Sequence, residues 1–279
     1  MFVEVAIVGA GPAGITCAIQ LEHHGIEFSL IEKERIGGLL LNANLVENLP
    51  LLPPIPGKEV VKMLKNTLER RGIDILYATV RTIEKIGSGF VLHHSDGIIQ
   101  SRYIVLATGT LPKRIKAFEV SPRIVYEPFK LFDVVGKCIA IAGSGEAAFD
   151  AALNLAKRNN VVLFTKHEPH KVSPKLIERA SKLKNIELKL CEPVKSVQVK
   201  GDGLLISTKA SLAFYDYLLI SIGRRANNGM ISEDLLNCEE LFLAGDVKRG
   251  ALGQATMAMG DGMEAAQKII ERLRRRNRN

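Results

Sequence analysis

The chain has 279 residues, of which 47% are hydrophobic and 24% are charged, a composition typical of a folded globular protein with one or two domains. Every apolar run is shorter than a membrane span of about 20 residues, and the first residues do not resemble a secretion signal. We therefore expect a cytoplasmic protein that makes no membrane contact.

The net charge of +8 comes largely from the last eight residues, 272–279, which hold five arginines. Without these five positive charges the net charge falls from +8 to +3. Arginines at the end of a helix favour the negative end of its dipole, so we expect a solvated helix end and no nucleic-acid site. The four cysteines form no Cys-x-x-Cys pair, and we expect neither a disulfide nor a metal site.

The first elements predict a nucleotide-binding unit. An apolar strand at 3–8 runs into the glycine motif GAGPAG at 9–14, and a helix and a second strand at 26–32 follow. Glycines at this spacing allow a tight turn, backbone approach to a pyrophosphate and close packing of helix on strand. Glu32 ends the second strand, where a carboxylate can accept hydrogen bonds from ribose hydroxyls.

The middle of the chain predicts further elements of the same sheet. A helix is expected over Gly57–Arg71, after the proline-rich loop that precedes it. A β-hairpin is expected over 90–100, and a buried strand over 103–109.

A second unit of the same kind begins at residue 137. A strand leads into Gly143-Ser144-Gly145-Glu146-Ala147-Ala148, and a helix and another strand follow. Lys166 and His167 end that strand in place of a carboxylate, which slightly favours NADP over NAD because basic groups tolerate a 2′-phosphate. A strand over 215–223, a strand over 241–247 and a long helix over 255–276 complete the chain.

Several segments resemble the low-molecular-weight thioredoxin reductases, which are FAD- and pyridine-nucleotide-dependent oxidoreductases. The similar segments are GAGPAGITCAIQL, IGGLLLNANLVENLP, VLATGTLPK, GSGEAAFDAA, ISIGRRAN and LFLAGDVKRGALGQATMAMGDGMEAA. They occur in the order of the family and cover nearly the whole chain. The resemblance implies an α/β fold of two Rossmann-like domains, the second inserted in the first. It places a FAD-binding domain at 1–111 and 225–279 and an NAD(P)-binding domain at 112–224.

Position by position, the resemblance also implies the cofactor contacts, with no catalytic side chain assigned. Asp246 follows an apolar strand and a glycine, where we expect a buried carboxylate that bonds the ribityl hydroxyls. The nicotinamide dinucleotide, NADP or NAD, is expected to meet Gly143, Gly145, Glu146, Ala147, Ala148, Lys166, His167, Ile222 and Gly223. FAD is expected to meet Gly9, Ala10, Gly11, Pro12, Ala13, Gly14, Glu32, Lys33, Gly38, Asn48, Val80, Ala107, Thr108, Gly109, Gly245, Asp246, Gln254 and Ala255.

The chain departs from this family where the redox-active Cys-x-x-Cys pair is expected. That register falls on Tyr126-Glu127-Pro128-Phe129, and a chain without a dithiol cannot pass electrons by thiol exchange. Cys138 is close in sequence, but it lies in a predicted strand, where we expect it to be buried and inert. Tyr126 and Phe129 are predicted either to pack in the core or to lie against the flavin.

The resulting functional hypothesis is an NAD(P)H oxidoreductase that passes electrons through FAD to an acceptor other than a disulfide. The acceptor could be a ferredoxin- or flavodoxin-like protein or a small molecule, and the basic chain suits an acidic protein. The alternatives are a FAD-bearing subunit of a larger oxidoreductase, a flavin-binding protein without turnover, and, least favoured, a flavoprotein that acts on RNA. The resemblance also implies a homodimer.

Overall fold

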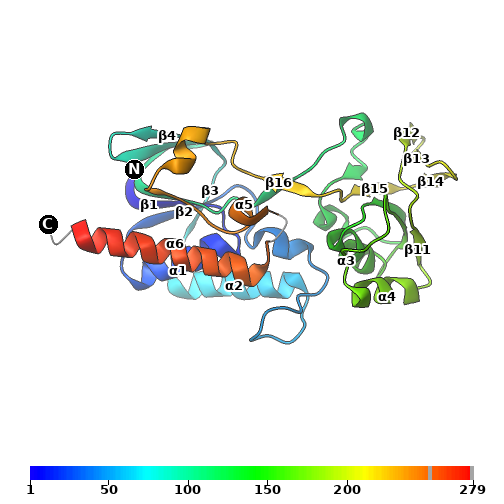
Figure 1. The fold of residues 1–279 in the computed structure, drawn as a ribbon, viewed down its shortest axis with the longest axis horizontal. Coiled ribbons are helices and arrows are strands. Elements are labelled where there is room, and N and C mark those ends of the chain that lie inside the picture. Colours follow the sequence, from blue (N-terminus) through cyan, green and yellow to red (C-terminus); the bar gives the residue numbers. More distant parts are fainter. Residues whose placement is uncertain (251–252, 277–279) are drawn as a thin grey trace. The chain divides into compact units, whose positions relative to one another are not determined.

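The computed structural model describes residues 1–250 and 253–276 (Figure 1). The chain forms two compact units. Unit 1 comprises Met1–Leu41, Val46–Leu111 and the chain from Arg225 onward, and unit 2 comprises Asn42–Leu45 and Pro112–Arg224. The grouping of Asn42–Leu45 with unit 2 was not predicted from the sequence.

Unit 1 is built on a seven-stranded sheet in the order β3-β2-β1-β6-β5-β4, with β17 also paired to β6. Neighbours among β3, β2, β1, β6 and β17 pair in parallel, whereas β4, β5 and the start of β6 pair antiparallel. The hairpin predicted at 90–100 is formed by β5 and the start of β6, and β6 continues into the strand predicted at 103–109. The strands are β1 (Phe2–Val8), β2 (Phe28–Glu32), β3 (Ile75–Tyr77), β4 (Val80–Ile86), β5 (Gly89–His94), β6 (Gly97–Leu106) and β17 (Leu241–Leu243).

The helices of unit 1 follow the sequence pattern closely. Helix α2 has the predicted bounds, Gly57–Arg71, because a proline precedes it and Gly72 ends it in the left-handed conformation (φ 65°). The long helix predicted at 255–276 is also confirmed as α6. The remaining helices are α1 (Pro12–His23), α5 (Asp246–Arg249) and the 3₁₀ helices η1 (Gly38–Asn42) and η4 (Glu233–Asn237).

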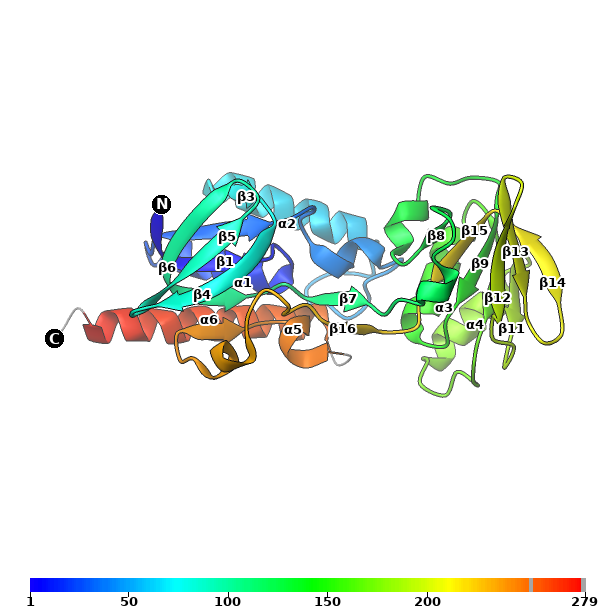
Figure 2. The same ribbon diagram turned by 90° about the horizontal axis from the view of Figure 1, so that it is seen from above.

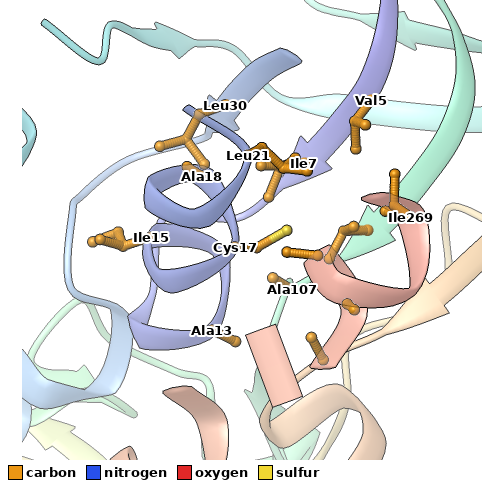
Figure 3. Packing of buried hydrophobic residues seen from close by; sticks show 14 of the residues in the cluster. Val5, Ile7, Ala13, Ile15, Cys17, Ala18, Leu21, Leu30, Ala107 and Ile269 are labelled. Atoms are coloured by element: carbon orange, nitrogen blue, oxygen red, sulfur yellow. The ribbon is translucent and has the colours of Figure 1, made fainter. Parts of the chain in front are cut away.

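One buried core of unit 1 lies between the sheet and the helices α1 and α6 (Figure 3), and a second contains other residues of the same sheet, including Val3, Phe90 and Leu92. Val5 and Ile7 of β1, Leu21 of α1 and Ile269 of α6 are fully buried there. Cys17 lies among them, and burial raises the pKa of its thiol. This cysteine is therefore a core side chain and not a reactive one.

Unit 2 contains a five-stranded parallel sheet in the order β11-β10-β9-β15-β8. Its strands are β8 (Ile124–Val125), β9 (Cys138–Ala142), β10 (Asn160–Phe164), β11 (Ile186–Lys189) and β15 (Tyr217–Ile220). The helices are α3 (Glu146–Leu155), α4 (Pro174–Lys182), η2 (Lys116–Phe118) and η3 (Pro128–Leu131). The strand predicted at 215–223 is shorter than expected, because Tyr215 belongs to the preceding strand.

Unit 2 also contains a three-stranded antiparallel sheet that the sequence did not predict (Figure 2). It consists of β12 (Ser196–Lys200), β13 (Gly203–Ser207) and β14 (Leu212–Tyr215). The chain passes between the two units in β7 (Thr110–Pro112) and β16 (Arg224–Ala226), which pair with each other. In the described part of the chain, no helix is both long enough and apolar enough to span a membrane.

Candidate cofactor sites

The first glycine motif forms the turn between β1 and α1. Gly9 has φ +110°, and a Cβ there would overlap the carbonyl oxygen of Ala107 at the end of β6. A Cβ on Gly14 would overlap the carbonyl oxygen of Gly9, so the helix packs directly on the turn. Gly11, in contrast, faces open space at the N-terminus of α1, and Pro12 begins the helix. Space remains at the positive end of the helix, where an anionic group would be stabilised.

Glu32 is buried at the end of β2, with 9% of its surface exposed. One of its oxygens accepts a hydrogen bond from the amide of Ala10 (2.8 Å). The other accepts bonds from the amides of Glu34 (3.0 Å) and Arg35 (3.3 Å). The carboxylate therefore holds the glycine turn and the loop after β2 in fixed positions.

A pocket opens beside Glu32 within unit 1. Five predicted FAD residues line it, namely Gly9, Glu32, Lys33, Val80 and Thr108. Sequence reasoning missed six further lining residues, Val8, Ile31, Ala78, Thr79, Asn227 and Met230.

Asn227 is the most specific of the missed residues. The hydroxyl of Thr108 donates to the backbone carbonyl oxygen of Asn227 (2.5 Å), and the backbone N–H of Asn227 donates to the carbonyl oxygen of Gly109 (3.0 Å). Asn227 is the last residue of the segment ISIGRRAN, but its partners lie more than a hundred positions away, so its place in the pocket could not be predicted from local spacing.

The remaining predicted FAD residues lie next to the same turn or next to each other. Gly38 lies beside Gly11, since a Cβ on Gly38 would be 3.5 Å from the Cα of Gly11. The side chain of Asn48 donates to Gln254 (2.6 Å), which joins two predicted residues 206 positions apart. Ala255 begins α6.

The predicted C-terminal motif also lies against the first glycine turn. Gly245 packs on Ala13, because a Cβ on Gly245 would be 3.1 Å from the Cβ of that alanine. Asp246 begins α5 and is only half-buried, so the buried carboxylate predicted there is more exposed than expected.

These features fit the adenosine and pyrophosphate parts of FAD. The open backbone at Gly11 leaves room for phosphates at a helix N-terminus. The pocket between β1, β2 and Thr108 supplies an apolar floor and one carboxylate, as an adenosine requires. The residues present therefore fit FAD.

The second glycine motif lies between β9 and α3 in unit 2. Gly143 packs tightly, because a Cβ there would overlap the carbonyl oxygen of Ser221 and the side chain of Ala148. Gly145 faces open space immediately before α3. Glu146 begins the helix, and its carboxylate accepts a hydrogen bond from the amide of Ser173 (3.1 Å). Both nucleotide motifs thus leave open space at a helix N-terminus.

The other predicted nucleotide residues lie near this turn. The amide of Lys166 donates to the hydroxyl of Ser144 (2.8 Å), so the end of β10 is fixed to the second glycine motif. The side chains of Lys166 and His167 are exposed. Ala147 lies in the first turn of α3, and Ile222 and Gly223 follow β15. Sequence reasoning missed Ser144 as a positioning residue, although it lies inside the motif.

The segment in the register of the missing dithiol is packed and hydrogen-bonded. Tyr126 is buried in the core of unit 2, and its hydroxyl accepts a bond from the amide of Ile115 (3.1 Å) and lies 3.2 Å from a carboxylate oxygen of Glu119. Glu127 forms an ion pair with Arg224 (2.9 Å) and accepts a bond from the side chain of Asn42 (2.8 Å). In unit 2 this segment therefore holds the buried ring of Tyr126 and the carboxylate of Glu127, which is paired with Arg224 and Asn42.

The four cysteines are free in the structure, and none pairs with another. Cys138 lies in β9 as predicted, but it is half-buried rather than buried. Burial raises the pKa of its thiol, and the charges of Asp216 and Glu187 raise it further. A thiol with a raised pKa is a poor nucleophile at neutral pH.

A match to a known protein family identifies the family of this chain. Residues 3–262 match the model of the family described as "Pyridine nucleotide-disulphide oxidoreductase". The chain belongs to this family. The match spans both glycine motifs and most of the C-terminal motif, and it ends within α6.

Curated relatives and solved structures agree with this assignment. The thioredoxin reductase of Helicobacter pylori is 26% identical over 97% of this chain and 99% of its own length. The "34.2 kDa protein in rubredoxin operon" of Clostridium pasteurianum is 26% identical over 94% of each chain. The crystal structure of Lactococcus lactis thioredoxin reductase superimposes with a TM-score of 0.85 at 22% identity, covering 96% of this chain and 98% of that one.

These findings confirm the predicted fold class, an α/β fold with two Rossmann-like domains, and the resemblance to thioredoxin reductases. This family member is an oxidoreductase of the flavoprotein type, and the predicted cofactors, FAD and a pyridine nucleotide, are those of its family.

Proposed function

We propose that this protein is an NAD(P)H oxidoreductase that passes electrons through FAD to an acceptor other than a protein disulfide. The observation that carries the proposal is the combination of two glycine-motif sites with a chain whose four cysteines are all free. In the register of the missing pair, Tyr126 and Glu127 have structural partners of their own.

In this proposal FAD is held by unit 1 and the nicotinamide dinucleotide by unit 2. The open helix end at Gly11 holds the FAD pyrophosphate, Glu32 bonds the ribose and Asp246 bonds the ribityl chain. The open helix end at Gly145 holds the second pyrophosphate, and the exposed Lys166 favours NADP over NAD. Once bound, the two cofactors themselves supply the hydride chemistry, so no protein acid or base is required.

The proposed acceptor is a small acidic redox protein, such as a ferredoxin- or flavodoxin-like protein. The net charge of +8 favours encounter with an acidic partner. The Clostridium pasteurianum relative, named for its place in a rubredoxin operon, supports an electron-transfer protein over a thiol substrate. We further propose a cytoplasmic homodimer, following the family.

The test is an acceptor assay on the purified full chain loaded with FAD. We expect NADPH to reduce the bound flavin without oxygen, and the reduced protein to pass electrons to an acidic iron–sulfur protein at a rate that falls with added salt. Reduction of thioredoxin or of a small disulfide at a comparable rate would contradict the proposal. Flavin that stays oxidised with both NADPH and NADH would indicate a flavin-binding protein without turnover.

Lys166→Ala tests the nucleotide site, with Lys171→Ala as the matched control. Lys171 is an exposed lysine five positions further along the chain, and it has no predicted contact with the nucleotide. Because Lys166 is proposed to contact the 2′-phosphate, its loss is expected to raise KM for NADPH several-fold and to leave KM for NADH unchanged. If both substitutions changed KM for NADPH equally, Lys166 would not contact the 2′-phosphate.

A further inference from the structure

A buried carboxylate in α6 has no role in the cofactor contacts described so far. Asp261 is 2% exposed, and in the described residues the only other buried carboxylate is Glu32, at 9%. A buried carboxylate must be paired with cations or hydrogen-bond donors, so the partners of Asp261 reveal what it does.

Within the described residues, the hydrogen-bond partners of Asp261 come from one short segment, Gly245–Arg249. Arg249 binds both carboxylate oxygens with its fork, at 2.7 Å and 2.7 Å. The amide of Gly245 donates to one oxygen (3.1 Å), and Lys248 donates to the other (3.3 Å). Burial alone would raise the pKa of Asp261, but these hydrogen bonds outweigh it and hold the pKa below its ordinary value.

The segment so held is α5, a helix of only four residues. A helix this short is not stable by itself, so its geometry depends on contacts from outside. Gly245 has φ +76°, a conformation that few other residues adopt. In the sequence, Asp246 lies between Gly245 and the two basic residues, Lys248 and Arg249. The carboxylate of Asp261 therefore fixes the backbone on both sides of Asp246.

The same stretch of α6 is fixed to the first glycine motif. Gly262, the next residue, packs so closely that a Cβ there would overlap the carbonyl oxygen of Ala13 in α1. The position of Asp246 is thus set relative to the Gly9–Gly14 turn through one rigid helix.

We infer that Asp261, together with Arg249, is a positioning residue that places Asp246 for the ribityl chain and so sets the affinity for the flavin half of FAD. The inference rests on the proposed function, in which FAD is bound by unit 1. It also makes a distinction, because the ADP half of FAD contacts the Gly9–Gly14 turn and Glu32, which Asp261 does not touch.

The test measures the dissociation constants of FAD and of ADP for the full chain freed of flavin. Asp261→Asn is expected to weaken FAD at least tenfold and to leave ADP within twofold, because only the flavin half depends on Asp246. Glu264→Gln is the matched control, since Glu264 lies one turn further on α6 and is ion-paired with Lys248, but does not contact Gly245. This control is expected to leave both constants within twofold.

An unchanged FAD constant in Asp261→Asn would overturn the inference. Equal weakening of FAD and ADP would also overturn it, because it would show a general structural role. If Asp261→Asn does not fold, Arg249→Lys decides: it keeps the charge but loses the two-bond fork, and is expected to weaken FAD at least threefold without affecting ADP. An unchanged FAD constant in that variant overturns the inference. A wild-type chain that binds ADP but not FAD would instead refute the proposed function itself.

Discussion

Among single residues, Gly14 and Gly11 of the first motif have different roles, in packing and in cofactor binding respectively. Gly14→Ala places a Cβ against the carbonyl oxygen of Gly9, and overpacking of this kind costs about 2 kcal/mol of unfolding free energy. Gly11→Ala meets open space, so the apo-protein should keep its stability while FAD binds at least tenfold more weakly. Urea unfolding of the apo-protein and FAD titration of both variants check this pair. Equal losses of stability would contradict it.

Tyr126 is a packing residue of unit 2 in this account. Tyr126→Phe removes the hydroxyl that contacts Ile115 and Glu119 but keeps the buried ring, and is expected to cost about 1 kcal/mol of unfolding free energy. The absorption spectrum of bound FAD should not change. A shifted flavin spectrum would instead support the alternative hypothesis that this ring lies against the flavin.

The residues that sequence reasoning found and missed differ in how far away their partners lie. Glu32 could be predicted because a fixed spacing separates it from the glycine motif. Asn227 ends the segment ISIGRRAN, but its contact with Thr108, which is 119 positions away, could not be predicted from local spacing. The burial of Asp261 was not predicted for another reason: an aspartate in the middle of a helix is expected at the surface unless its buried partners are known.

At the level of elements, helix α6 approaches α1 most tightly at Gly262, beside the carbonyl oxygen of Ala13. Gly262→Ala would push α6 away from the carbonyl oxygen of Ala13 and is expected to cost about 2 kcal/mol of unfolding free energy. Gly260→Ala on the same helix meets no atom and should stabilise the protein by about 0.5–1 kcal/mol through helix propensity. Thermal unfolding of the two variants decides. A destabilised Gly260→Ala would refute this description of the contact.

The three-stranded sheet of unit 2 holds a tyrosine that gives it a pH dependence. Burial raises the pKa of Tyr215 from 10.0 to about 12. Because the folded pKa lies above the unfolded one, stability is complete below pH 10 and falls as the pH rises from about 10 to 12. At one pKa unit per 1.36 kcal/mol, the wild type should lose about 2–3 kcal/mol more than Tyr215→Phe over this interval. Denaturant unfolding at both pH values measures the difference, and parallel pH profiles would contradict it.

This sheet also shows where element prediction fails. Helix α2 could be predicted residue by residue, because Pro56 and Gly72 mark its ends and its apolar residues recur at helical spacing. Strand β12 (SVQVK) is short, and β13 (GLLIS) and β14 (LAFY) do not alternate between polar and apolar residues. Val199, Leu212 and Phe214 are also exposed, so the apolar residues do not mark one buried face. Their pairing is fixed by packing in unit 2, which the local sequence does not reveal.

At the scale of the whole molecule, the order of strand, glycine turn, helix and strand was enough to predict the fold class. The twofold occurrence of this order, at Gly9–Gly14 and at Gly143–Ala148, also predicted two nucleotide-binding folds. The grouping of Asn42–Leu45 with unit 2 could not be predicted. It depends on side-chain bonds such as that from Asn42 to Glu127, which is 85 positions away.

In the proposed function, electrons pass from NAD(P)H to FAD with no protein disulfide in the path. Counting the electrons taken up per bound FAD, by titration with dithionite in the absence of oxygen, tests it most directly. FAD accepts two electrons, and a redox-active disulfide would accept two more. Because the four cysteines form no Cys-x-x-Cys pair and none is bonded to another, we predict full reduction at two electrons per FAD. An uptake of four electrons per FAD would show a redox-active disulfide and would refute the proposed function.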